Sequence, residues 1–355
     1  MGQRLKIFSL LVVLLMLNGC AELQYYGHAV SGQLEVIDKR RPIPAVIADP
    51  ATDDVVRDRL KYIEQAHTFA IRHLHLPDSD SFRSYSDVGR PYVLWNVFAT
   101  PELSLDTKQW CYPFLGCLGY RSYFNETCAQ AVATQLANEG WDVHIARSPA
   151  YSTRGFFADP VYNPMLRYPE LDIAAILFHE LAHEKIYMQD DSQANESFAV
   201  AVQFEGVRRW LEHTKQPQRY AEYRLSEQRE EEFIALLSRF REALTNLYKT
   251  TKPDDIKRQE KRVIFKQLRD SYESLKSTWQ DYGGYDHWFT TPLNNAVLAP
   301  VGTYHGDTAA FEQLLYEKGR DLEEFYRAAQ RLAELDKQER RKELQALHER
   351  YRAND

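Results

Sequence analysis

Two histidines and a glutamate, close together in the sequence, have the types and spacing of a zinc-dependent hydrolytic site. His179 and His183 are four residues apart, and Glu180 directly follows the first of them. On an α-helix, residues four apart lie one turn apart on the same face, so both imidazoles can bind one metal ion. Glu180 lies beside them, where its carboxylate can take a proton from a water that the metal activates. The pattern predicts metal-assisted hydrolysis, with Glu180 as the catalytic base and one Zn²⁺ as the cofactor.

A catalytic zinc site also needs a third protein ligand and one open coordination position. No histidine lies between His183 and His213, which excludes the arrangement with a third histidine shortly downstream. Glu196 comes thirteen residues after His183, beyond a turn-like segment, and an antiparallel second helix would bring it back to the metal. We therefore predict Glu196 as the third ligand, and we expect Asp190 and Asp191 to be capping or solvated turn residues.

The main alternative is a pair of histidines that are hydrogen-bonded in an ordinary core. The motif lies in a strongly apolar stretch, residues 171–182. Two imidazoles and a carboxylate buried there without partners would cost on the order of several kcal/mol. A shared metal ion satisfies all three groups, so we favour the metal site.

Three further polar residues are candidates for stabilising the oxyanion of the transition state. Tyr151, Tyr304 and His305 lie in loop-like segments from which they could donate a hydrogen bond. Each has a structural alternative, because most of the 22 tyrosines must serve packing and His305 comes just before a predicted helix start. Residues 143–148 form a predicted strand that could pair with a peptide substrate or serve as a plain structural strand.

The elements that must position these residues follow from the spacing of apolar side chains. Helical spacing is found over residues 53–76, 169–188 and 193–213, and again in the charge-rich stretches 218–249, 253–282 and 307–352. Residues 91–100 and 141–146 are instead typical of strands. We predict a predominantly helical α+β fold for a single domain over residues 20–355. It would have a small sheet between residues 85 and 150 beside the motif helix, and a long-helix C-terminal part over about 215–355.

The N-terminus has the pattern of an export signal. Residues 1–19 run from a basic start through an apolar stretch, residues 7–17, that is too short to span a bilayer comfortably. Cys20 follows Leu-Asn-Gly, which resembles the bacterial lipobox, where cleavage before the cysteine leaves it as the lipid-modified N-terminus. Ala21 resembles the residue that directs such lipoproteins to the outer membrane. We expect a lipid-anchored envelope protein that binds the bilayer through Cys20 and faces the periplasm; an ordinary secreted protein is the alternative.

Besides the lipid-modified Cys20, the expected mature chain has three cysteines, and an oxidising compartment permits disulfides between them. Cys111 and Cys117 flank a turn-rich stretch with Pro113 and Gly116, so we predict that they form a disulfide. Cys128 lies in a helical-looking stretch and is expected to be a buried small apolar residue.

The charge distribution excludes one class of partner. The formal net charge is −7, and charges of both signs are spread along the chain without a basic stripe. We therefore expect no binding to nucleic acid, because that binding requires clustered lysine and arginine to neutralise phosphates.

Six short motifs together resemble the bacterial family described as putative aminopeptidases. They are WNVFA (95–99), WCYPFLGCLGYRSYF (110–124), AYSTRGFFADP (150–160), FHELAH (178–183), NESFA (195–199) and LNNA (293–296). The resemblance covers most of the mature chain. It implies a lipoprotein peptidase whose zinc ligands are two histidines and a glutamate, in the general pattern of thermolysin-like peptidases.

Three positions depart from these patterns. Arg154 and Phe156 stand where the family tends to have an aliphatic residue and a tryptophan, which bears on the substrate pocket. Val200 stands where thermolysin-like enzymes often have an aspartate that orients a metal-bound histidine. The residue that orients the histidine must come from elsewhere in this chain.

These observations favour a zinc-dependent peptide hydrolase of the envelope, with aminopeptidase activity implied by the resemblance. Two alternatives retain the metal: a zinc amidase that acts on cell-wall peptides, and a metal-binding envelope lipoprotein without turnover. A helical scaffold without a metal is the remaining alternative.

Overall fold

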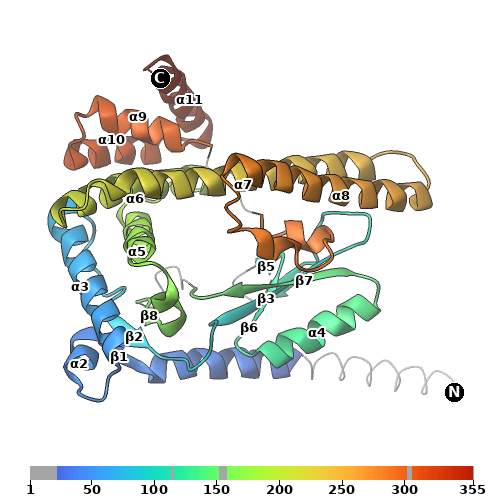
Figure 1. The fold of residues 1–355 in the computed structure, drawn as a ribbon, viewed down its shortest axis with the longest axis horizontal. Helices are drawn as coiled ribbons and strands as arrows, with labels where there is room; N and C mark the ends of the chain where they lie inside the picture. Colours follow the sequence, from blue (N-terminus) through green and yellow to red (C-terminus); the bar gives the residue numbers. More distant parts are fainter. Residues whose placement is uncertain (1–21, 113–115, 152–157, 302–305, 355) are drawn as a thin grey trace, which may run out of the picture.

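The computed structural model describes residues 22–112, 116–151, 158–301 and 306–354. It shows an α+β fold in which helices predominate, which confirms the predicted class (Figure 1). The helices are the N-terminal helix (residues 22–38), α2 (Ile43–Ala48), α3 (Asp54–Leu74), α4 (Glu126–Asn138), α5 (Glu170–Lys185), α6 (Ser192–His213), α7 (Arg219–Tyr248), α8 (Asp254–Thr278), α9 (Thr308–Glu317), α10 (Leu322–Glu334) and α11 (Lys337–Asn354). The signal segment 1–19 and Cys20 lie outside the described residues.

Helices α5 and α6, which carry the predicted metal ligands, are held in the largest apolar core of the described chain. Helix α5 begins after Pro169 and has Glu170 and Asp172 in its first turn, where carboxylates favour the positive end of the helix dipole. Gly206 of α6 lies against Phe178 of α5 and Leu74 of α3, and a Cβ at that position would come within 2.8 Å of the Phe178 ring. Glycine therefore allows the three helices to approach closely.

The strands form small sheets. They are β1 (Arg40–Pro42), β2 (Ser84–Ser86), β3 (Leu94–Thr100), β4 (Trp110–Tyr112), β5 (Gly116–Leu118), β6 (Arg121–Tyr123), β7 (Asp142–Ser148) and β8 (Val161–Tyr162). The strand orders are β1-β2-β8, β6-β3-β7 and β4-β5. In the second sheet, Trp95, Val97 and Ala99 of β3 pack against α4, whereas Leu94 on the opposite face joins the core around α5.

Strand β7 forms one edge of its sheet, and the LNNA motif holds its first residues. The side chain of Asn294 donates to the Val143 carbonyl at 3.0 Å. The backbone amide of Asn295 donates to the Asp142 carboxylate at 2.9 Å. The amide side chain of Asn295 is fully buried and donates to three carbonyls of the loop after β3, those of Pro101, Glu102 and Ser104.

The C-terminal half is helical, but the expected stretch 307–352 is divided into the three helices α9, α10 and α11. The first break follows Glu317, where Gly319 and Arg320 take positive φ angles of 64° and 57°. Helices α7 and α8 form a separate hairpin that packs around its own apolar cluster. Within the described ranges, no helix has the length and hydropathy needed to cross a membrane.

A disulfide joins Cys111 and Cys117, which are directly opposite each other in the β4–β5 pair. Cys128 is free and half-buried in α4.

Candidate metal centre

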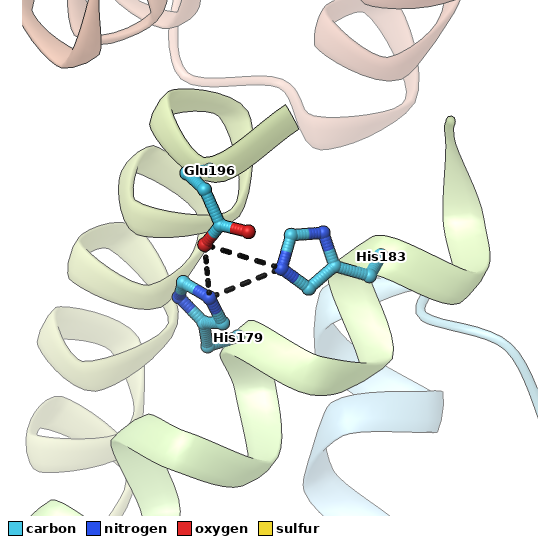
Figure 2. Close-up of side chains that lie close together, drawn as sticks. All are labelled: His179, His183 and Glu196. Atoms are coloured by element: carbon cyan, nitrogen blue, oxygen red, sulfur yellow. Dashed lines mark hydrogen bonds and ion pairs between the residues drawn. The ribbon is translucent and has the colours of Figure 1, made fainter. Parts of the chain in front are cut away.

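Three side chains from α5 and α6 converge on one point. Figure 2 shows the rings of His179 and His183 and the carboxylate of Glu196 facing one another. The two Nε2 atoms are 3.1 Å apart, and Glu196 Oε2 lies 3.3 Å from the first and 3.6 Å from the second. In the described part of the chain, these residues are the one group of three with the donors of a metal site.

The triangle of donor atoms has the size of one face of a zinc coordination tetrahedron. Metal–ligand bonds of about 2.0–2.1 Å place tetrahedral ligand atoms about 3.3–3.4 Å apart, close to the three distances observed here. The side chains of His179, His183 and Glu196 are 17%, 25% and 39% exposed, so solvent reaches them. The donors therefore fit a metal ion that keeps one position open for water or substrate.

Gln203 orients His179 from α6. Its Oε1 lies 3.0 Å from His179 Nδ1, and its Nε2 donates to the Tyr223 hydroxyl at 2.6 Å and to Glu227 Oε2 at 3.4 Å. Because the amide nitrogen faces the carboxylate of Glu227, the amide oxygen must accept from His179. A neutral imidazole that donates from Nδ1 has its lone pair on Nε2, the atom that faces the other two donors. We call Gln203, Tyr223 and Glu227 the Gln203 network.

The outer end of this network is electrostatically unusual. Burial, followed by the negative charge of Glu230, raises the pKa of Glu227 to about 7. Burial also raises the pKa of Asp172, which lies in the first turn of α5 and adds to the negative potential at Glu227. Carboxylates so close together cannot all ionise freely, because each charge disfavours the next.

Glu196 is positioned by the residues on either side of it in the NESFA motif. The Asn195 side chain exchanges two hydrogen bonds of 2.7 Å with the backbone of Met188, in the segment that connects α5 to α6. Ser197 Oγ accepts from the Asp307 amide at 3.2 Å, and Phe198 packs among the aromatic rings of α9 and α10. The turn therefore has a defined shape, which brings Glu196 back to α5.

The first turn of α6 is also fixed by ion pairs from the C-terminal helix. Asp191 caps α6 by accepting from the Ala194 amide, in agreement with the expected capping role. Its fully buried carboxylate pairs with Arg340 at 3.3 Å and with Arg341 at 2.5 Å. Arg340, 2% exposed, also donates to carbonyls at the end of α10, those of Leu332, Ala333 and Leu335. We call Asp191, Arg340 and Arg341 the Asp191 network.

The Glu196 carboxylate and the histidines stabilise one another's charged forms. Hydrogen bonds with His179 and then His183 hold the pKa of Glu196 far below its ordinary value. Burial acts to lower the pKa of His183, but the hydrogen bond and negative charge of Glu196 outweigh it and raise that pKa. The site therefore holds an ionised carboxylate among basic nitrogens, the donor set that a divalent cation prefers.

Glu180 lies beside the three donors with a different electrostatic environment. Burial raises the pKa of its carboxyl group, and the nearby charges of His179 and His183 oppose that shift. A raised pKa makes a carboxylate a stronger base, which suits proton transfer near neutral pH. The structure thus brings together all four residues of the predicted centre.

The other candidates are placed differently. The Tyr151 hydroxyl donates to Gln33 of the N-terminal helix, and its ring stacks on Tyr162 with 5.6 Å between centroids. These contacts give Tyr151 a packing role. Tyr304 and His305 lie outside the described residues, as do Arg154 and Phe156.

Comparison with known families adds one match. A sequence model of the family described as "Putative aminopeptidase" matches residues 24–344. The chain belongs to this family. No curated protein and no solved structure matches the chain. The matched range includes the three candidate metal ligands, the Gln203 network and the Asp191 network. Membership in the putative aminopeptidase family supports a peptidase as the class of enzyme.

Sequence reasoning missed Gln203, although a signal for it exists. Gln203 follows Glu196 by seven residues, two helical turns along α6, so the two side chains share a face. The pattern of thermolysin-like enzymes directs attention to position 200, where this chain has valine. In this protein the orienting group is one turn further along the helix.

Proposed function

We propose that this protein is a zinc-dependent peptidase, with His179, His183 and Glu196 as the zinc ligands. The observation that supports this most directly is the triangle of donor atoms, with edges of 3.1, 3.3 and 3.6 Å. Thermolysin-like peptidases use the same ligand types, and the arrangement of α5 and α6 is consistent with that pattern. Family membership supports peptide bonds as the substrate.

In the proposed reaction, zinc supplies Lewis-acid activation of water and of the peptide carbonyl. Glu180 accepts the proton of the attacking water and delivers it to the leaving amine. Gln203 keeps His179 in the tautomer that presents Nε2 to the centre. Strand β7, at the edge of its sheet, is our candidate for pairing with the extended substrate backbone.

We further propose an aminopeptidase of the bacterial envelope, anchored by lipid on Cys20 at the outer membrane and facing the periplasm. The family description supports the aminopeptidase assignment, and the lipobox-like sequence supports the anchor. An amidase that acts on cell-wall peptides is the second candidate, because the same location would give such an enzyme access to its substrate.

The decisive experiment is the substitution Glu180→Gln, measured for both zinc content and hydrolysis. We expect equimolar zinc in the wild type and the variant, and a loss of hydrolysis of about 10²–10⁴-fold in the variant, because the base is removed and the ligands are kept. Aminoacyl dye substrates report aminopeptidase activity, matched N-blocked peptides report endopeptidase activity, and cell-wall peptides report amidase activity.

Glu184→Gln is the matched control, because Glu184 is exposed on the same helix. It should leave zinc content and turnover unchanged. If His179→Ala kept full zinc content and full activity, the whole assignment would be wrong. Zinc binding with no hydrolysis of any peptide by the wild type would instead favour the non-catalytic alternative.

A further inference from the structure

The N-terminal helix, residues 22–38, carries a continuous exposed stripe of large apolar side chains. The stripe consists of Leu23, Tyr26, Val30, Leu34 and Ile37, which are 74%, 37%, 58%, 58% and 37% exposed. Their spacing of three or four residues places them along one face of the helix. The other large exposed apolar residues of the described chain fall on separate elements, and single exposed residues of that kind need no partner.

The opposite face of this helix is packed firmly against the rest of the protein. Val36 is fully buried, and a Cβ at Gly32 would collide with the Phe124 ring. Glu22 pairs with Arg121, and the guanidinium of Arg121 lies over the Tyr25 ring, with its Cζ atom 3.6 Å from the ring centroid. These contacts fix the rotation of the helix about its axis, so the apolar stripe is held outward.

We propose that this stripe lies on the surface of the phospholipid bilayer to which the chain is anchored. The inference rests on the anchoring that we propose above. Leu23, the first residue of the stripe, follows Cys20 by three residues and the apolar segment 7–17 by six. Either a lipid on Cys20 or a retained apolar segment would bring the first turn of the helix to the membrane surface. Figure 1 shows the helix along one edge of the molecule, opposite α9, α10 and α11.

The composition of the stripe favours a bilayer over a second copy of the chain. Five side chains along about four helical turns bury too little area for a stable dimer, which typically needs about 1,200 Å² or more. A bilayer needs no complementary surface, since each apolar side chain gains separately by entering the boundary between headgroups and acyl chains.

The lack of basic residues beside the stripe also predicts how its insertion depends on the charge of the lipid headgroups. The other exposed residues between Leu23 and Ile37 are Gln24, Gly27, His28 and Ser31, and none of these is lysine or arginine. Attraction to anionic headgroups therefore contributes little, and insertion depends on apolar burial. We expect equal insertion into neutral and anionic vesicles.

The test places a fluorescent label on the membrane-anchored full-length protein. Val30→Cys is labelled in a Cys128→Ser background, and the protein is inserted into vesicles with or without brominated phosphatidylcholine. Val263→Cys on α8 is the matched control, because Val263 is 53% exposed on a different element. We expect bromine to lower the fluorescence at position 30 about twofold and to leave position 263 unchanged.

A second variant tests the stripe itself. Val30→Glu combined with Leu34→Glu should abolish quenching of a label at position 26, whereas Val263→Glu should preserve it. Absence of quenching at position 30 in an anchored protein would overturn the proposal, as would self-quenching that rises with protein density, which indicates a second copy. Release of the protein by a salt wash would overturn the anchor and this inference together. Zinc content and peptide hydrolysis, measured separately, report on the proposed function.

Discussion

The two sides of the candidate metal centre are held by different kinds of interaction. On the α5 side, His179 is oriented by the Gln203 network, a chain of hydrogen bonds that reaches α7. On the α6 side, Glu196 depends on a turn that the Asp191 network connects to α11. The first network sets the direction of one lone pair, whereas the second sets the position of a whole helix terminus.

This difference predicts different consequences when each network is broken. The Gln203 network contacts a donor ring directly, so its loss should change metal affinity more than folding. In the Asp191 network, Asp191 and Arg340 are both buried, so loss of the carboxylate leaves a buried arginine without its partner and should change folding most. Three substitutions test the comparison.

The largest effect is expected for Asp191→Ala. We expect a decrease in the free energy of unfolding of about 3–5 kcal/mol, because Arg340 then stays buried without its carboxylate. Denaturant unfolding of the metal-free protein measures it. Asp190→Asn is the control, since Asp190 is an exposed neighbour with positive φ that asparagine tolerates; it should change stability by less than about 0.5 kcal/mol. Equal stability of the two variants would mean that the ion pairs contribute nothing.

A smaller effect is expected for Gln203→Leu, and it should appear in metal binding. We expect the dissociation constant for zinc to rise about 10–100-fold, because His179 loses the acceptor that fixes its tautomer and orientation. Competition with a chelator measures this constant. Gln203→Glu restores an acceptor and should recover part of the affinity, while Gln228→Leu on the exposed face of α7 should have no effect. Unchanged zinc affinity in Gln203→Leu would contradict the orienting role.

The smallest effect is expected for Glu227→Gln, and it should depend on pH. The pKa of Glu227 is raised from 4.5 to about 7 in the folded protein. Between these values the folded state holds a proton that the unfolded chain releases, so Glu227 destabilises the fold as pH rises. We expect the free energy of unfolding of the variant to exceed that of the wild type by about 1–2 kcal/mol at pH 8. This value is smaller than the pKa shift alone implies, because solvent partly screens the half-buried Glu227. The difference should fall to about a quarter of that value at pH 5 and vanish below about pH 4, where the unfolded chain also holds the proton.

Unfolding curves at the two pH values measure this difference. Glu222→Gln, on the exposed side of α7, is the control and should show the same stability difference at both pH values. If the wild type and Glu227→Gln kept a constant difference from pH 5 to pH 8, the raised pKa of Glu227 would be wrong.

Sequence alone located the centre because its first three residues belong to one helix. The order His179, Glu180, x, x, His183 fixes their relative directions through helix geometry, whatever the rest of the fold does. Glu196 was predictable from the length of the turn and the lack of another histidine. Helix α3 and strand β7 also followed from periodicity, and strand β3 from its content of β-branched and aromatic residues; both are local properties of the chain.

The division of residues 307–352 into three helices was not predicted, since apolar spacing continues across the breaks. Gly319 is a sequence signal for the first break, because glycine readily takes a positive φ angle. Arg320, the next residue, also takes a positive φ angle, although its type does not signal a break. The apolar stripe on the N-terminal helix was also missed, because a stripe of that spacing predicts a buried face, and only the docked helix shows which face remains exposed.

Tertiary structure decided which groups support the donors. Gln203 is 24 residues from His179, and Arg340 is 149 residues from Asp191. Contacts at such separations depend on how the helices pack, and packing is set by the volume and shape of many apolar side chains together. The sequence by itself therefore indicated the proposed chemistry of the centre, because the predicted base and two of the three predicted ligands are neighbours on one helix. Its orientation and rigidity were decided by helices that meet only in the folded chain.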